Sequence, residues 1–299
     1  MVKIAWHPLY AHPLPEGHRF PMLKYELIPE QLLHEGLIIH EYLFEPEPLT
    51  EEVLLLTHDR QYWEQLRDFT LPAKEQRRIG FPLNAQLVER EMRIAQGTVE
   101  GALYAQQYGL AFNVAGGTHH AGSDWGEGFC LLNDQAIAAN YLLNNHLAKR
   151  ILIIDLDVHQ GNGTAEIFKD EPRVFTFSMH GDKNFPFRKE KSDLDIGLED
   201  GCEDDEFLTR LGIAMKSLKS FQPDFVFYLA GADVLESDSL GKLALTKFAC
   251  KERDRMVFQF CKKNNLPVQV SMGGGYSPDI KDIVDAHCNT IKTGIDIFE

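Results

Sequence analysis

The sequence ILIIDLDVHQGNG, from Ile151 to Gly163, begins as an apolar run and then becomes abruptly polar. The apolar part is typical of a buried β-strand, and Asp155, Asp157 and His159 follow at every second position. In an extended chain such residues point the same way, so two carboxylates and an imidazole emerge together. Like charges in such a place need a cation or a hydrogen-bond network to compensate them. The stretch therefore predicts a strand that ends in a polar site.

Four further apolar runs have the same character: LAFNVA, RVFTFSM, PDFVFYLAGAD and LPVQVSMGGG. Helical patterns separate the runs, among them FCLLNDQAIAANYLLNNH, DEFLTRLGIAMKSLKSF and ACKERDRMVFQFCKKN, and a long helix is predicted from Leu83 to Tyr108. Strand–helix alternation indicates parallel βαβ units, and uniformly apolar strands indicate a sheet that is covered on both faces. We predict an α/β fold, a three-layer single domain over residues 1–299 with a central, mainly parallel sheet.

Each predicted strand ends in a polar or glycine-rich loop. The five loops read GGTHHAG, DLDVHQGNG, SMHGD, AGADV and GGGYSP. In open α/β sheets, binding sites lie at the carboxyl ends of the strands. We therefore expect these loops to converge on one edge of the sheet.

Composition limits the partners that we expect. The net charge of −15 argues against direct binding of nucleic acid, because a phosphate-binding surface is basic. An acidic surface can attract cationic substrates such as lysine side chains or polyamines, although ordinary solubility charge is the commoner meaning. No apolar run approaches the roughly 18 residues of a membrane span, and MVKIAWHPLY does not resemble a secretory signal. Five scattered cysteines without a CxxC pair are typical of reduced thiols, so we expect a cytoplasmic protein.

A metal site needs one more ligand besides Asp157 and His159, because catalytic sites use three protein ligands and leave a position open. Asp233 is the best candidate, since it ends the apolar run FVFYLAGAD after small residues. A lone carboxylate at a strand end is usually a helix cap, but the neighbouring Asp-x-Asp-x-His run favours a ligand. The set suits Zn²⁺ and also admits Fe²⁺, Co²⁺ or Mn²⁺. Asp155 is expected to orient a nearby histidine.

Further candidates for chemistry lie in two of the other loops. GGTHHAG places His119 and His120 after two glycines, where they could act as general base and general acid beside a metal. MGGGYSP places Tyr276 after three glycines, where its phenol could donate to a developing oxyanion. Without the metal ligands, adjacent surface histidines and a packed loop tyrosine would be the ordinary interpretations.

These residues together resemble the histone deacetylase superfamily, which has an arginase-like α/β fold. The motifs HRFPMLKY, GGTHHAG, EGFCLLND, DLDVHQGNG, FSMHG, GAD and MGGGY occur in that order over nearly the whole chain. The opening HRFPMLKYELIPEQL and the segment RRIGFP at residues 77–82 are most similar to bacterial relatives of the class IV deacetylases.

The resemblance implies a role for each matching residue. Zinc would be held by Asp157, His159 and Asp233, with Asp155 bonded to the first residue of the catalytic pair His119 and His120. Tyr276 would polarise the substrate carbonyl. The substrate channel would include Gly128, Phe129, Phe185 and Gly274. Many relatives also bind K⁺, which here would involve Asp155, Asp157, His159, Ser178 and Met179.

The chain departs from the best-known members of the superfamily at Gln160 and Asn162, where they have His and an acid. Related subgroups also carry Asn, so the change does not argue against activity. A neutral amide can orient His120 but stabilises its charged form less than a carboxylate would. We therefore predict that His120 protonates less readily here than in Asp-containing relatives.

The implied reaction is hydrolysis of an Nε-acyl-lysine amide, acetyl or longer, in a protein or peptide. Acetylated polyamines, as small acylated amines, are the main enzymatic alternative, although the chain has no obvious room for the long extra loop of polyamine-type relatives. An arginase-type enzyme would need a second cation cluster, and only one is evident. A catalytically silent acyl-lysine-binding module should have lost a metal ligand, the histidine pair or the tyrosine, and all of these are present. A nucleotide site at GNGTAE fails, because its glycines do not complete GxGxxG. The sequence leaves the oligomeric state open.

Overall fold

The computed structural model describes residues 2–299, and the strands within them form one sheet whose neighbouring strands are all parallel. The order across the sheet is β2-β1-β3-β8-β7-β4-β5-β6. The strands are β1 (Lys3–Ala5), β2 (Leu43–Phe44), β3 (Leu110–Asn113), β4 (Ile151–Asp155), β5 (Val174–Gly181), β6 (Leu194–Leu198), β7 (Phe225–Leu229) and β8 (Val268–Ser271).

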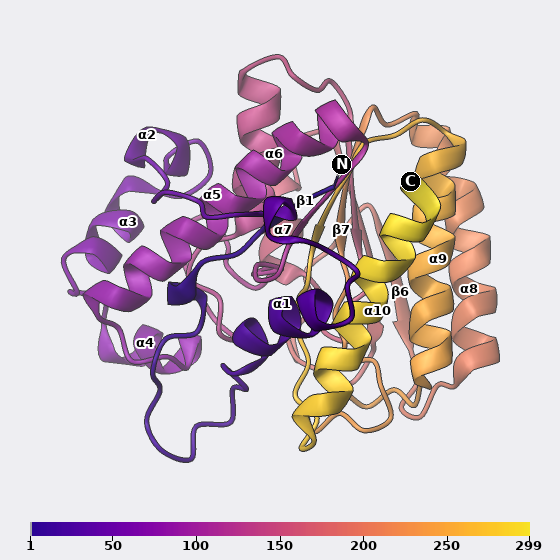
Figure 1. Cartoon of the computed structure of the whole chain (residues 1–299). Coiled ribbons are helices and arrows are strands. Elements are labelled where there is room, and N and C mark those ends of the chain that lie inside the picture. The colour runs from indigo at the N-terminus through magenta and orange to yellow at the C-terminus, as the bar shows by residue number, and fades with distance from the viewer. Residues whose placement is uncertain (1) are drawn as a thin grey trace.

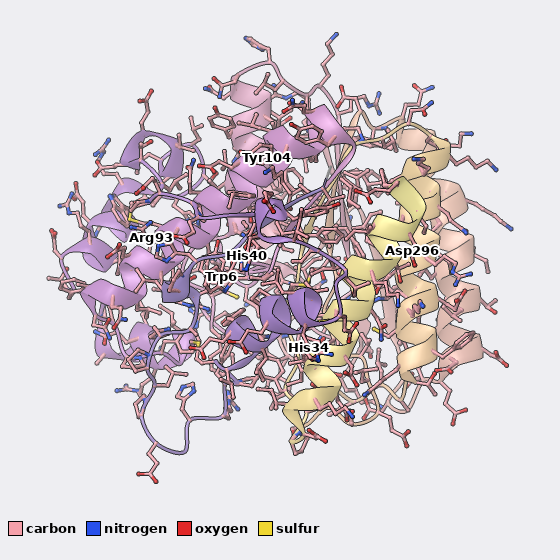
Figure 2. All side chains as sticks on the ribbon, in the orientation of Figure 1. Trp6, His34, His40, Arg93, Tyr104 and Asp296 are labelled. Atoms are coloured by element: carbon pink, nitrogen blue, oxygen red, sulfur yellow. The ribbon has the colours of Figure 1, made fainter. Side chains whose placement is uncertain are left out.

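Helices cover both faces of this sheet, as Figure 1 shows, with α8, α9 and α10 on one side and α5 and α6 on the other. Side chains fill the space between these layers (Figure 2). The helices are α1 (Lys24–His34), α2 (Glu51–Leu54), α3 (Arg60–Arg67), α4 (Ala73–Ile79), α5 (Ala85–Tyr108), α6 (Asp134–Asn144), α7 (Asn162–Phe168), α8 (Asp204–Leu218), α9 (Lys247–Lys263) and α10 (Ile280–Phe298). Short 3₁₀ helices lie at Pro8–Tyr10, His40–Tyr42 and Lys219–Phe221.

Local sequence explains where the main elements begin and end. Strands β3, β4, β7 and β8 are buried at every residue, as expected for apolar strands with helices on both faces. The long helix α5 begins after Asn84, whose side chain accepts the Leu87 N–H, and ends at Gly109 with φ 90°. Glycine relieves the strain of that left-handed conformation, which favours a helix end here.

The predicted α/β fold with a parallel central sheet is confirmed, and the five predicted strands are the adjacent strands β3, β8, β7, β4 and β5. Their loops therefore share one edge of the sheet, as expected. The prediction missed three strands of the outer parts of the sheet, β1, β2 and β6. Two of them are three residues or fewer, and β6 alternates between half-buried and exposed positions over most of its length.

Two further expectations concern the whole chain. Among the described residues, no helix combines the length and apolarity that crossing a membrane requires. The five cysteines are free thiols, and all are buried.

Candidate metal centre and active site

Three side chains of ligand type meet where the neighbouring strands β4 and β7 end. Asp157 and His159 follow β4, and Asp233 follows β7. One ligand atom from each lies within 4.8 Å of those from the other two, and all three residues are buried. The Val158 N–H donates to Asp233 Oδ1 at 3.0 Å, so the two loops are joined directly. The structure thus brings together the three ligands that the sequence predicted.

This cluster needs positive charge. The Nδ1 atom of His159 lies 3.0 Å from an Asp157 oxygen and 3.1 Å from an Asp233 oxygen. Burial opposes protonation of the His159 ring, yet these two carboxylates raise its pKa to about 10. Burial and the Asp157 charge raise the pKa of Asp233 to about 7. Within residues 2–299 no Lys or Arg forms an ion pair with either carboxylate. A divalent cation would supply the missing charge, and one imidazole with two carboxylates suits Zn²⁺, Fe²⁺ or Co²⁺.

The glycine-rich loop after β8 reaches this cluster because it lacks side chains. The Gly274 N–H donates to Asp157 Oδ2 at 2.9 Å, and a Cβ atom on Gly274 would collide with the Asp233 carboxylate. Only glycine therefore fits at this position. Gly274, which was expected to line the substrate channel, lies at its inner end, against the carboxylates.

His119 is paired with Asp155, as the resemblance implied. Its Nδ1 lies 2.7 Å from Asp155 Oδ2, and both side chains are buried. Burial opposes protonation of His119, but the Asp155 carboxylate outweighs it and raises the pKa of the imidazole above its ordinary value. Asp155 also accepts the Asp157 N–H at 3.1 Å, so it ties the histidine to the ligand loop.

His120 has a different partner, and its environment acts in the opposite direction. Its Nδ1 lies 2.6 Å from Asn162 Oδ1, while the Asn162 amide donates to Glu127 Oε1 at 2.7 Å. An ionised carboxylate accepts but does not donate, so Glu127 sets the amide orientation, and the amide oxygen requires a proton on His120 Nδ1. Burial and the neighbouring His119 and His159 charges hold the pKa of His120 well below its usual range. The neutral imidazole thus keeps Nε2 as its basic atom.

Glu127 is a site residue that the sequence analysis missed. It continues the hydrogen-bonded series from His120 through Asn162 to Arg78, whose guanidinium contacts its other oxygen at 2.6 Å. In the sequence EGFC, Glu127 directly precedes the channel residues Gly128 and Phe129. This position next to the channel motif is the signal that could have identified Glu127.

Tyr276 is positioned as a hydrogen-bond donor. Its backbone N–H donates to Asp238 Oδ2 at 2.6 Å, and its ring packs on Phe20 and Phe129 with centroids 5.9 and 6.0 Å apart. Burial and the Asp233 charge raise the pKa of the phenol well above its usual value. The hydroxyl therefore stays protonated and can donate to an oxyanion.

Lys24 is a second residue that the sequence analysis missed. This fully buried lysine begins α1 and donates to the Gly273 carbonyl at 3.2 Å, with its ammonium 5.8 Å from the centre of the Tyr276 ring. Burial lowers its pKa to about 8. In the sequence HRFPMLKY this lysine follows Met and Leu, and these apolar neighbours were the only signal of a buried position. The signal is weak, because a lysine at the start of a helix is normally exposed to solvent.

The predicted channel residues Gly128, Phe129 and Phe185 stand around His120. The Phe185 ring lies edge-to-face on the His120 ring at 4.9 Å, and a Cβ atom on Gly128 would lie 2.7 Å from His120 Cδ2. Phe129 has a left-handed backbone with φ 68°, and its N–H donates to the Ile79 carbonyl at 2.7 Å. The segment at residues 77–82 therefore holds the channel wall in its strained conformation.

The site has an inner and an outer space. The inner cavity has a volume of about 40 Å³ and reaches past His119 and Tyr276 to Tyr25 and Arg90. A groove of about 380 Å³ lies outside it and shares its walls at His120, His159, Phe129 and Tyr276. The inner cavity can hold a few waters or a small group.

The expected potassium residues lie beside the same edge. Ser178 is the register partner of Asp155 in the β4–β5 pair, and the hydroxyl of Ser178 lies 2.9 Å from His180 Nδ1. Met179 is fully buried in β5. The K⁺ site itself stays a prediction.

The fold and the site define an α/β protein with a metal-ligand triad, a histidine pair and a tyrosine at the carboxyl edge of a parallel sheet. The sequence profile of the histone deacetylase domain matches residues 18–291. The chain belongs to the histone deacetylase family, and this membership supports hydrolytic deacetylase activity.

Relatives match over almost the whole chain. An uncharacterized protein of Picosynechococcus sp. is 45% identical over 99% of both chains. Histone deacetylase 1 of Homo sapiens is 30% identical over 94% of this chain and 61% of its own length. A solved HDAC homolog complexed with SAHA has TM-score 0.82 and 26% identity, covering 99% of this chain and 88% of that one. The HDAC homolog from Aquifex aeolicus has TM-score 0.82 and 27% identity, covering 98% and 84%. The superfamily assignment and its bacterial character are confirmed, while the class IV subgroup stays a prediction.

Proposed function

We propose that the protein is a metal-dependent amidohydrolase that removes an acyl group from Nε-acyl-lysine in a protein or peptide. The observation that carries the proposal is the meeting of the ligand triad, the histidine pair and Tyr276 around one narrow cavity. The HDAC homolog that is complexed with SAHA shares this fold, which supports a ligand resembling acyl-lysine in the channel.

Asp157, His159 and Asp233 would hold the metal ion, for which Zn²⁺ is our first choice. When bound, such an ion polarises a carbonyl oxygen and lowers the pKa of water. Among residues 2–299 neither carboxylate forms an ion pair with Lys or Arg, which supports a metal ion as their partner. The Tyr276 phenol, kept protonated by burial, donates to the acyl oxygen as negative charge develops on it.

His120 is the proton carrier in this proposal. Its low pKa leaves Nε2 free to accept the proton of the attacking water, whose oxygen bonds to the acyl carbon. The same histidine then donates this proton to the lysine nitrogen as the amide C–N bond breaks. The Asp155 carboxylate raises the pKa of His119 and so favours its charged form, which would support the oxyanion. Opposite pKa shifts in two adjacent groups are typical of such a division of roles.

The inner cavity favours a short acyl group. Its volume of about 40 Å³ exceeds the space for one water but is far below that of a fatty chain. We therefore expect acetyl-lysine peptide to be hydrolysed faster than myristoyl-lysine peptide.

The test is release of carboxylate by the zinc-loaded protein from acetyl-lysine peptide, myristoyl-lysine peptide and acetylputrescine. Activity on acetyl-lysine peptide that disappears in Asp233→Ala supports the proposal. Hydrolysis of acetylputrescine alone would favour the polyamine alternative. Absence of turnover with bound metal would favour a binding module.

A further inference from the structure

Cations surround the opening of the channel. Arg19, Arg78, Lys183 and Lys242 all line the outer groove, and all four are exposed. Of the described residues that line the groove, none is Asp or Glu. This is contrary to the whole chain, whose net charge is −15. The acidic overall charge therefore does not describe the surface that a substrate meets.

The four cations differ in how far they are already paired. Arg78 is bound by Glu127 at 2.6 Å, whereas Lys183 pairs with Glu199 at 3.3 Å and Lys242 with Asp200 at 3.8 Å. The carboxylates of these two lysine pairs are themselves 75% and 42% exposed, so the pairs are weak.

Arg19 is the least compensated of the four. Within residues 2–299 it forms no ion pair, and its guanidinium lies 5.1 Å from the centre of the Phe129 ring, on the channel wall. Its cationic edge therefore stays available beside the point where a lysine side chain would enter.

The charge changes sign beyond Phe187, which is 88% exposed and lines both the outer groove and a neighbouring one. Unlike the outer groove, that neighbouring groove is lined by carboxylates as well as by cations. Its charged lining residues are Glu75, Arg78, Asp124, Glu127, Arg188 and Glu190. A substrate thus meets a basic surface on one side of Phe187 and a mixed, largely acidic one on the other.

We propose that the enzyme selects acyl-lysine with acidic residues on one flank, bound by Arg19, Lys183 and Lys242. This inference rests on the proposed function and names its substrate class. With the acyl-lysine in the channel, the residues next to it in the peptide can extend along the groove. Each extended residue covers up to about 3.5 Å, so the first few residues on either side can contact the groove cations. Acetylputrescine would instead place its free ammonium among four cations, so it should be a poor substrate.

The experiment compares kcat/KM for three acetyl-lysine peptides, with two Glu before the lysine, two Glu after it, or Gln at all four positions. One of the Glu peptides should exceed the Gln peptide by roughly threefold to tenfold at low salt. The ratio should fall toward one as NaCl is raised, because salt screens exposed charges.

The variant Arg19→Gln with Lys242→Gln should remove most of this preference. The matched control is Lys216→Gln with Lys263→Gln, which removes two exposed cations from α8 and α9 that do not line the groove. The control should keep the wild-type ratio.

The outcomes separate this inference from the proposed function. Equal rates on all three peptides, or a preference that survives in the groove variant, would overturn the charge selection while the hydrolase stands. No hydrolysis of any peptide, with zinc shown to be bound, would overturn both.

Discussion

At the scale of single residues, the group facing each histidine decides where its proton stays. His120 faces an amide, and the nearest carboxylate on that side, Glu127, lies beyond Asn162. Asn162→Asp alone would place two carboxylates against each other, which is unfavourable in a buried place. The informative variant is therefore the exchange Asn162→Asp with Glu127→Gln, which moves the negative charge to His120.

This exchange should raise the pKa of His120, which is now held well below its ordinary value by burial. His120 acts from its neutral form, so a higher pKa moves the acidic limb of the kcat/KM profile to higher pH. The pH–rate profiles of wild type and the double variant test this, with Glu127→Gln as the single control. An unmoved acidic limb would contradict the assignment of His120 as base.

Tyr276→Phe removes one hydroxyl that acts on the developing oxyanion. Loss of one such donor typically lowers kcat by roughly 10²–10³. The ring contacts with Phe20 and Phe129 remain, so the urea midpoint should stay close to that of wild type. A variant that keeps most of its turnover would show that Tyr276 has another role.

Lys24 should destabilise the fold in a pH-dependent way. Burial lowers its pKa from 10.5 to about 8, so the unfolded chain holds this proton more tightly. The resulting loss in the free energy of unfolding is on the order of 3 kcal/mol. This loss is fully present below pH 8 and disappears as the pH rises toward 10.5. The difference in unfolding free energy between Lys24→Met and wild type should thus shift in favour of wild type from pH 7.5 to pH 10. An unchanged difference would mean that the pKa of Lys24 is not lowered in the folded protein, so that its ammonium is as well stabilised there as in water.

At the scale of elements, the sequence predicted the strands that carry the site because each is an uninterrupted apolar run. The loops after β3, β4, β7 and β8 could be assigned since parallel strands place their ends at one edge. Lys24 was missed because its partner Gly273 is 249 positions away and no local pattern reports that contact. Arg90 lies on the apolar side of α5, against the inner cavity, and was missed for the same reason.

Asn133 joins three elements, which makes it a sharper test than an ordinary cap. Its oxygen accepts the Ala136 N–H at the start of α6, while its amide donates to Ala121 O and Thr164 Oγ1, both at 3.0 Å. Asn133→Ala loses a cap and leaves a buried carbonyl unpaired, so we expect a loss of about 2–4 kcal/mol.

The matched control for this loss is Asn84→Ala, which removes the exposed cap of α5 and should cost about 1 kcal/mol. Urea unfolding of both variants gives the comparison. Because Ala121 follows His120 directly, Asn133→Ala should also lower kcat, whereas Asn84→Ala should not. Equal losses of stability would argue against the joining role.

At the scale of the whole molecule, buried neutral histidines should set the acid limit of stability. Burial lowers the pKa values of His12, His58 and His180 from 6.5 to about 4, and that of His287 well below its ordinary value. Between pH 6.5 and 4 the unfolded chain therefore binds more protons than the folded one. Stability from these residues is complete above pH 6.5 and is lost as the pH falls toward 4.

Urea midpoints measured from pH 7 to pH 4.5 should therefore decrease steadily. Protonation of His159 and the carboxylate ligands also releases a bound metal in this range, so the series is run with zinc and with a chelator. The histidine contribution should persist in both series, whereas the metal contribution should appear only with zinc. A midpoint that stays constant with chelator would mean that these histidines have about the same pKa in the folded protein as in the unfolded chain. The fold's acid sensitivity would then come from the metal centre alone.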